Sequence, residues 1–144
     1  MARPEKAVIE ERKNFLQVIA ECTTNASKFS EVFLNHKLFP YNQKYVDCQD
    51  RFIVYRSGRQ VGKTMSTAVK AVHFAFFAPV LLDTVTNECT IVIAAPTQNQ
   101  ATIMFDRIRS LLINNDFLKG FIVRNTQTEM WVNFLDNTGM SKIV

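Results

Sequence analysis

The part of the chain with the clearest chemistry is a stretch of eight residues that contains two glycines and ends in a lysine and a threonine. It reads Ser57-Gly58-Arg59-Gln60-Val61-Gly62-Lys63-Thr64. Phosphate oxygens are bound by backbone N–H groups at short range, which a glycine makes accessible and the first turn of a following helix supplies. Lys63 would reach the β and γ phosphates of a nucleoside triphosphate, and the Thr64 hydroxyl would bind Mg²⁺. The stretch predicts a site for ATP and magnesium.

The first glycine is displaced from the usual phosphate-binding pattern. That pattern has a glycine, four further residues and then Gly-Lys-Ser or Gly-Lys-Thr. Here Ser57 stands at the first glycine position and Gly58 follows it. We expect the loop to begin with a different turn, while its residues from Ser57 to Thr64 still contact the nucleotide. The competing interpretation is a chance Gly-Lys-Thr at the start of a helix.

The segments that flank this stretch predict how it is positioned. Phe52-Ile53-Val54-Tyr55 is a continuous apolar run, which is typical of a strand buried on both faces. From Lys63 to Phe77 apolar residues recur every three or four positions, which predicts a helix, and Pro79 is expected to end it. Strand, loop and helix in this order are the context that a phosphate-binding loop requires.

The following segments extend the same alternation. Thr90 to Ala94 predicts a second buried strand, and Gln98 to Ile113 predicts a second helix. Strand, helix, strand and helix together predict an α/β fold with a parallel sheet and right-handed crossovers. Residues 121–123, 130–135 and 140–144 are strand-like, and Asp136 to Gly139 is a turn signal between the last two.

The N-terminal part predicts helices. Glu5 to Glu21 has apolar residues near helical spacing, and a shorter helix is expected from Ser27 to Asn35. We therefore divide the chain into an N-terminal helical extension, residues 1–37, and a second domain, residues 38–144.

Composition narrows the class of protein. The chain has 144 residues, 47% of them hydrophobic, and a net charge of +4, which fits a globular domain that contacts polyphosphate or nucleic acid. Three cysteines without a close pair, Cys22, Cys48 and Cys89, favour free thiols over a disulfide framework or a zinc motif. His36 and His73 have no ligand partner at metal-binding spacing. No signal peptide and no apolar run of membrane-spanning length is evident, which predicts a cytosolic protein without membrane contact.

Three stretches resemble the large terminase subunits of tailed bacteriophages and related viruses, whose ATPase domain drives DNA into the procapsid. Arg59 to Thr64, with its displaced first glycine, is similar to the terminase form of the phosphate loop. Phe39 to Gln43 resembles the upstream adenine-recognition segment, and Ala94 to Gln98 resembles the segment after the next strand. The resemblance covers about residues 38–144 and implies a P-loop NTPase core of the RecA-like (ASCE) type, here incomplete.

The resemblance also implies roles for single residues. Gln43 would contact the adenine base, although a solvent-facing helical glutamine is the alternative. Arg59 would be an arginine supplied in cis to the γ phosphate, and with Lys63 it would be catalytic; an exposed arginine facing DNA is its alternative. Implied partners are double-stranded DNA, the portal protein, the small terminase subunit and further copies in a homo-oligomeric ring. The expected location is the host cytoplasm, and transiently the portal vertex of the procapsid.

Hydrolysis also requires acidic residues that this sequence does not supply in the expected form. A strand that ends in Asp-Glu would hold magnesium and position the attacking water, and no apolar run ends in that pair. Asp136 is the nearest candidate, but its surroundings predict a turn. We therefore expect an N-terminal fragment or incomplete gene product of a longer ATPase, with little or no turnover of its own and with any nuclease domain beyond Val144.

Two other functions remain open at the level of sequence. The first is the front half of a superfamily 2 helicase, which uses a similar glutamine, phosphate loop and Pro-Thr segment, although Arg59-Gln60 argues against it. The second is a non-catalytic nucleotide-binding assembly module that docks through the helix at Glu5 to Glu21.

Overall fold

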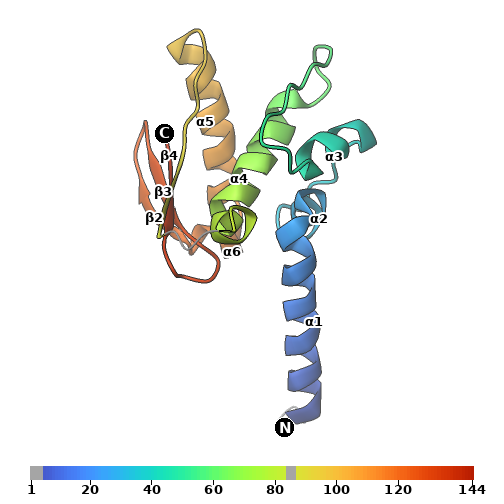
Figure 1. Cartoon of the computed structure of the whole chain (residues 1–144). Helices are drawn as coiled ribbons and strands as arrows, with labels where there is room; N and C mark the ends of the chain where they lie inside the picture. The colour runs from blue at the N-terminus through green and yellow to red at the C-terminus, as the bar shows by residue number, and fades with distance from the viewer. Residues whose placement is uncertain (1–4, 84–86) are drawn as a thin grey trace.

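The computed structural model describes residues 5–83 and 87–144, which form a mixed α/β fold with a small four-stranded sheet flanked by helices. The helices and strands, in chain order, are α1 (Glu5–Thr24), α2 (Ala26–Val32), α3 (Pro40–Asp47), α4 (Lys63–Leu81), β1 (Glu88–Ile91), α5 (Gln98–Ile113), α6 (Asp116–Lys119), β2 (Ile122–Asn125), β3 (Met130–Asn133) and β4 (Met140–Ile143). Helices α4 and α5 lie side by side against one face of the sheet, and α1 extends away from it (Figure 1).

The sheet is mixed, whereas the sequence predicted a parallel one. Its strand order is β1-β4-β3-β2. Only β1 and β4 pair in parallel, and the pairs β3–β4 and β2–β3 are antiparallel. The short turn at residues 134–139 allows β3 and β4 to form a hairpin, and such a hairpin is necessarily antiparallel. The predicted strands at 121–123, 130–135 and 140–144 are thus present with small shifts of their ends.

The predicted strand at Phe52 to Tyr55 is absent. Residues 48–62 contain no helix or strand, and the side chains of Phe52 and Val54 are 83% and 87% exposed. Apolar and β-branched residues favour a strand only where a neighbouring strand pairs with its N–H and C=O groups. None of the four strands of the sheet pairs with this segment. The prediction that it is buried on both faces was therefore wrong.

The second predicted buried strand is a sheet edge. β1 ends at Ile91, its side chains alternate between exposed and partly buried, and Val92 is 69% exposed. A strand at the edge of a sheet that is covered by helices on one face keeps one face and one edge in solvent. The prediction of burial on both faces was wrong here too, because it assumed a central position.

Pro79 does not end α4, which continues to Leu81. A proline in a helix leaves the carbonyl four residues earlier without its usual N–H donor. That carbonyl belongs to Ala75, and it accepts a hydrogen bond of 2.8 Å from the Ser141 hydroxyl on β4. The sheet thus supplies the donor that the proline lacks, and a contact distant in sequence lets the helix continue.

The core joins both predicted domains. Its fully buried members come from helices and strands throughout the described chain, among them Cys22, Phe29, Phe76, Ile108, Leu112, Val132 and Ile143. Phe29 of α2 packs edge-to-face on Phe77 of α4, with ring centroids 5.9 Å apart. The segment expected to be an N-terminal extension therefore shares its apolar core with α4.

Helix α4 is the central element of this core. Within the described ranges it is also the one helix long and apolar enough to cross a membrane, and half of that apolar window is buried inside the protein. A core helix of a globular protein passes the same test, so this observation is weak evidence for a membrane span. The absence of membrane contact stays a prediction.

His73 of α4 is a core residue. It is 3% exposed, and its Nε2 lies 2.7 Å from Cys22 O, so we assign the ring as neutral with the proton on Nε2. Burial lowers the pKa of His73 below its ordinary value of 6.5. The neutral ring of His73 therefore binds a second proton, at Nδ1, less readily in the folded state than in the unfolded state.

Acidification is expected to destabilise the fold through His73. Because the pKa of His73 is lower in the folded state, its contribution to the free energy of unfolding is fully present above pH 6.5. That contribution is lost as the pH falls below 6.5. We expect the free energy of unfolding to fall by up to about 1 kcal/mol per pH unit between about pH 6 and pH 5. Urea denaturation at several pH values measures this slope. His73→Gln should flatten it, and the wild-type slope in this variant would contradict the assignment.

Candidate functional site

The stretch from Ser57 to Thr64 leads directly into α4, as predicted. Gly62 is the N-cap of this 19-residue helix and has a φ of 82°, in the left-handed region that favours glycine. A Cβ at Gly62 would lie 3.0 Å from Asn42 Nδ2. Position 62 thus needs glycine for its backbone conformation and for a close contact with α3. The first-turn N–H groups of α4 have no acceptor within the helix, as at every helix start.

Lys63 folds back over the loop. Its Nζ donates hydrogen bonds to Ser57 O at 2.5 Å and to Gly58 O at 3.0 Å. An ammonium group has three donors, so one stays available for a ligand. The Ser57 hydroxyl is buried and has no hydrogen-bond partner among the described residues. Buried polar atoms normally have a hydrogen-bond partner. The Ser57 hydroxyl could therefore still form a hydrogen bond with a ligand near Lys63.

Helix α3 holds both ends of the loop through Asn42. Asn42 Nδ2 donates to Val61 O at 2.9 Å, and Asn42 Oδ1 accepts a hydrogen bond from the Tyr55 hydroxyl. The sequence placed Asn42 in the Phe39 to Gln43 segment without a role of its own; in the structure it lies in the first turn of α3, which begins at Pro40. The signal that could have found this role is the polar residue that follows Phe39-Pro40-Tyr41, because a buried asparagine requires partners for both ends of its amide.

Helix α3 is in turn fixed to α4. The ring of Tyr45 stacks on that of Tyr55 with centroids 4.2 Å apart and planes 6° from parallel, and its hydroxyl lies 3.2 Å from Thr67 Oγ1. Lys70 Nζ donates to Val46 O at 2.9 Å and to Cys48 O at 2.6 Å, at the C-terminal end of α3, where a cation is favourable. Burial lowers the pKa of Lys70. Loop, α3 and the first two turns of α4 are therefore one connected unit.

Gln43, predicted to recognise adenine, lies on α3 directly after Asn42. Its Nε2 donates a hydrogen bond of 2.9 Å to Leu38 O, and the residue is partly buried. The structure therefore brings the predicted base-recognition segment against the loop through Asn42, while the Gln43 amide is turned toward the start of its own helix.

The remaining predicted contacts lie on the open side of the loop. Arg59, Gln60 and Thr64 are exposed, and Gln60 has a φ of 61°. Ion pairs in the described part of the chain join Arg109 to Asp106, and both Arg124 and Lys142 to Glu129. None of them neutralises a basic residue of the loop. The exposed bases nearby in sequence are Lys44, Arg51, Arg56 and Arg59. The loop therefore presents uncompensated positive charge.

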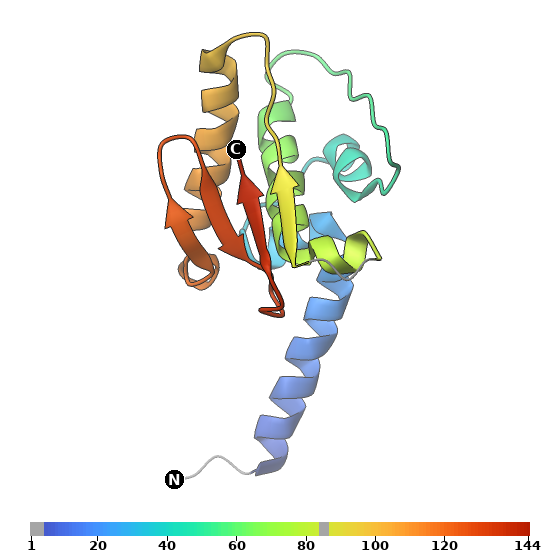
Figure 2. The ribbon, with the colours of Figure 1, turned by 60° about the vertical axis from the view of Figure 1, so that its left-hand side comes forward.

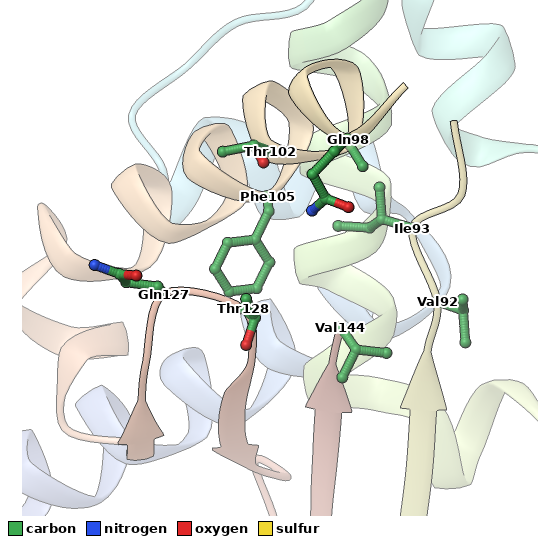
Figure 3. A pocket seen from close by; sticks show the side chains of 9 residues that line it. Val92, Ile93, Gln98, Thr102, Phe105, Gln127, Thr128 and Val144 are labelled. Atoms are coloured by element: carbon green, nitrogen blue, oxygen red, sulfur yellow. The ribbon is translucent and has the colours of Figure 1, made fainter. Parts of the chain in front are cut away.

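A separate cavity of about 280 Å³ opens at the carboxyl ends of β1 and β4. Figure 3 shows Gln98 and Thr102 of α5 on one side of it, Gln127 and Thr128 on the other, and the Phe105 ring between them. The start of α4 faces the same end of the sheet (Figure 2). No charged side chain lines the cavity and no residue of the loop reaches it. The cavity is therefore less suitable for binding phosphate than the loop, which has basic side chains.

Acidic ligands for a metal are not gathered at this site. No group of three or more histidine, cysteine or acidic side chains that could hold a metal ion is present in the described ranges. Asp136 is an exposed turn residue, as the sequence predicted, and its Oδ1 accepts from Thr138 N at 3.0 Å and from Thr138 Oγ1 at 2.7 Å. Magnesium would therefore depend on the Thr64 hydroxyl and on the phosphates of a bound nucleotide. The three cysteines are free thiols, as predicted.

No protein-family model matches the chain, and no curated protein matches it. The interpretation of the site therefore depends on the residues of the loop and on the geometry that surrounds them.

Proposed function

We propose that this chain binds the phosphates of ATP between Ser57 and Thr64, as the ATP-binding part of a viral DNA-packaging motor of the terminase type. The observation that supports this best is the arrangement at the start of α4. Gly62 adopts the left-handed conformation, and the Lys63 ammonium lies against the carbonyls of Ser57 and Gly58. Backbone N–H groups, a helix start and a lysine at one point form an anion site.

We assign each residue of the proposed site a contact with the nucleotide or with Mg²⁺ that is compatible with its position. The N–H groups at the end of the loop and in the first turn of α4 would hold the phosphate oxygens, and Lys63 would exchange its carbonyl partners for the β and γ phosphates. Exposed Arg59 would approach the γ phosphate. The Thr64 hydroxyl would hold Mg²⁺, which neutralises phosphate charge when bound. Gln43 would turn from Leu38 O toward the adenine edge.

In this proposal the chain contributes nucleotide binding to a P-loop NTPase core, in a motor that couples ATP hydrolysis to DNA movement into the procapsid. The positive charge of the loop, which no ion pair neutralises among the described residues, supports a polyanionic ligand. Double-stranded DNA, the portal protein and the small terminase subunit remain proposed partners on the strength of the sequence resemblance alone.

Titration calorimetry of the purified chain with ATP, ADP, AMP and adenosine, each with Mg²⁺, tests the proposal. We expect saturable binding of ATP and ADP, because both phosphates of ADP reach the loop. AMP and adenosine should bind at least about tenfold more weakly, since they lose the charge-assisted hydrogen bonds of Lys63. Well-folded protein that takes up no ATP, or that binds adenosine as tightly as ATP, would contradict the proposal.

A further inference from the structure

Asn42 is buried where α3 meets the loop, and both ends of its amide are engaged. The residue is 1% exposed. It donates to Val61 O and accepts from the Tyr55 hydroxyl, so one side chain binds the chain before and after residues 56–60. A buried amide with both ends paired fixes its partners in position, because breaking either bond leaves an unpaired polar group.

The bond to Val61 O also determines where the next N–H points. The described residues contain no cis peptide bond, and in a planar trans peptide the C=O and N–H groups point in opposite directions. Since Val61 O faces Asn42, the N–H of Gly62 faces away from α3. That N–H precedes the free first-turn N–H groups of α4, so the direction set by Asn42 adds one more donor to this group.

The hydrogen bond from the Tyr55 hydroxyl to Asn42 is held in place by the packing of Tyr55. The Tyr55 ring, whose hydroxyl donates to Asn42, lies flat against Tyr45, and Tyr45 contacts Thr67 of α4. The contact of Asn42 with the loop is also tight, because a Cβ at Gly62 would lie 3.0 Å from Asn42 Nδ2. Asn42 is thus held by Tyr55 and by its place in α3, and a shift of its side chain would break the bond to Val61 O.

We propose that Asn42 is a positioning residue of the phosphate site: by holding Val61 O and Tyr55 together it keeps the 57–62 loop open in the form that accepts phosphate. The inference rests on the proposed function. It adds to the phosphate site a residue that lies outside the loop and differs from the predicted base-contacting residue, Gln43. Asn42 acts through the backbone of the loop, so its effect concerns the phosphates and is independent of the base.

The test compares MgATP with magnesium tripolyphosphate, which has phosphates and no base, by titration calorimetry of the full chain. We expect Asn42→Ala to weaken the binding of both ligands equally, by about tenfold, because both hydrogen bonds of a buried amide are lost. Tyr55→Phe keeps the stack on Tyr45 and loses one bond, so it should weaken both by about threefold. Gln43→Ala should weaken ATP alone. A loss confined to ATP in Asn42→Ala, or no loss, would overturn the proposal.

Asn115→Ala is the matched control. The Asn115 amide caps α6 and donates to Phe33 O, and among the described residues it makes no hydrogen bond to the loop or to α3, so its removal should lower Tm and leave both affinities unchanged. Amide hydrogen exchange of residues 58–62 without ligand separates this inference from the proposed function. If the wild-type chain binds neither ligand, the proposed function fails, and faster loop exchange in Asn42→Ala still supports the positioning role. Exchange at the wild-type rate overturns it.

Discussion

Replacing Lys63 by alanine is expected to weaken the binding of MgATP by about 100-fold, because the loop loses the cation that we propose binds the terminal phosphates. Lys63 Nζ is the one side-chain cation that contacts the backbone of the loop in the described chain, at Ser57 O and Gly58 O. Exposed Arg59 keeps long-range attraction in the variant but has no fixed position at these carbonyls. Titration calorimetry with MgATP measures the loss.

Lys119→Ala is the matched control for this experiment. Lys119 is an exposed residue at the end of α6 and lies outside the loop and α3. The variant loses the same charge, and its affinity for MgATP should remain within about twofold of the wild type. Equal losses for Lys63→Ala and Lys119→Ala would indicate general attraction of a polyanion and would remove the case for a defined phosphate site.

Replacing Phe76 by alanine is expected to lower the free energy of unfolding by about 3–5 kcal/mol. Phe76 is 2% exposed, lies at the centre of the core on α4 and packs edge-to-face on Phe121 at 5.5 Å between ring centroids. Its carbonyl also accepts the backbone N–H of Leu135. The side chain cannot be removed without a cavity between helix and sheet. Urea denaturation followed by circular dichroism measures the loss.

Phe52→Ala is the paired experiment, because the sequence pattern and the structure disagree on this residue. The apolar run predicts Phe52 in a buried strand, whereas the structure leaves its side chain 83% exposed. An exposed phenylalanine should cost less than about 0.5 kcal/mol when it is removed. A loss comparable to that of Phe76→Ala would show that residues 52–55 are buried in solution and would contradict the irregular conformation of this segment.

The helices were predictable because their signals are local. The span of α5 agrees with the prediction from Gln98 to Ile113, since Thr97 caps it and accepts a hydrogen bond from Gln100 N. The start of α4 at Lys63 follows in the same way from Gly62. The end of α4 could not be predicted, because the donor that offsets Pro79 is Ser141, distant in the sequence. The short helix α6 was not anticipated.

Strand burial was predicted less well, for a general reason. A run such as Phe52 to Tyr55 has the composition of a buried strand, but a strand also requires a neighbouring strand, and sequence periodicity does not show whether one is available. The same limit affected the second strand, which lies at the edge of the sheet as β1. The sheet is mixed and not parallel as expected, because β2, β3 and β4 pair in antiparallel directions.

The sequence by itself determined the position of the loop, because glycine, lysine and a helix start act within a few residues of each other. It indicated Ser57 to Thr64, and the structure presents these residues together at the start of α4. Only the tertiary structure revealed what holds the loop. Asn42 binds Val61 O across 19 residues of chain and accepts from the Tyr55 hydroxyl across 13, and no local pattern identifies these partners.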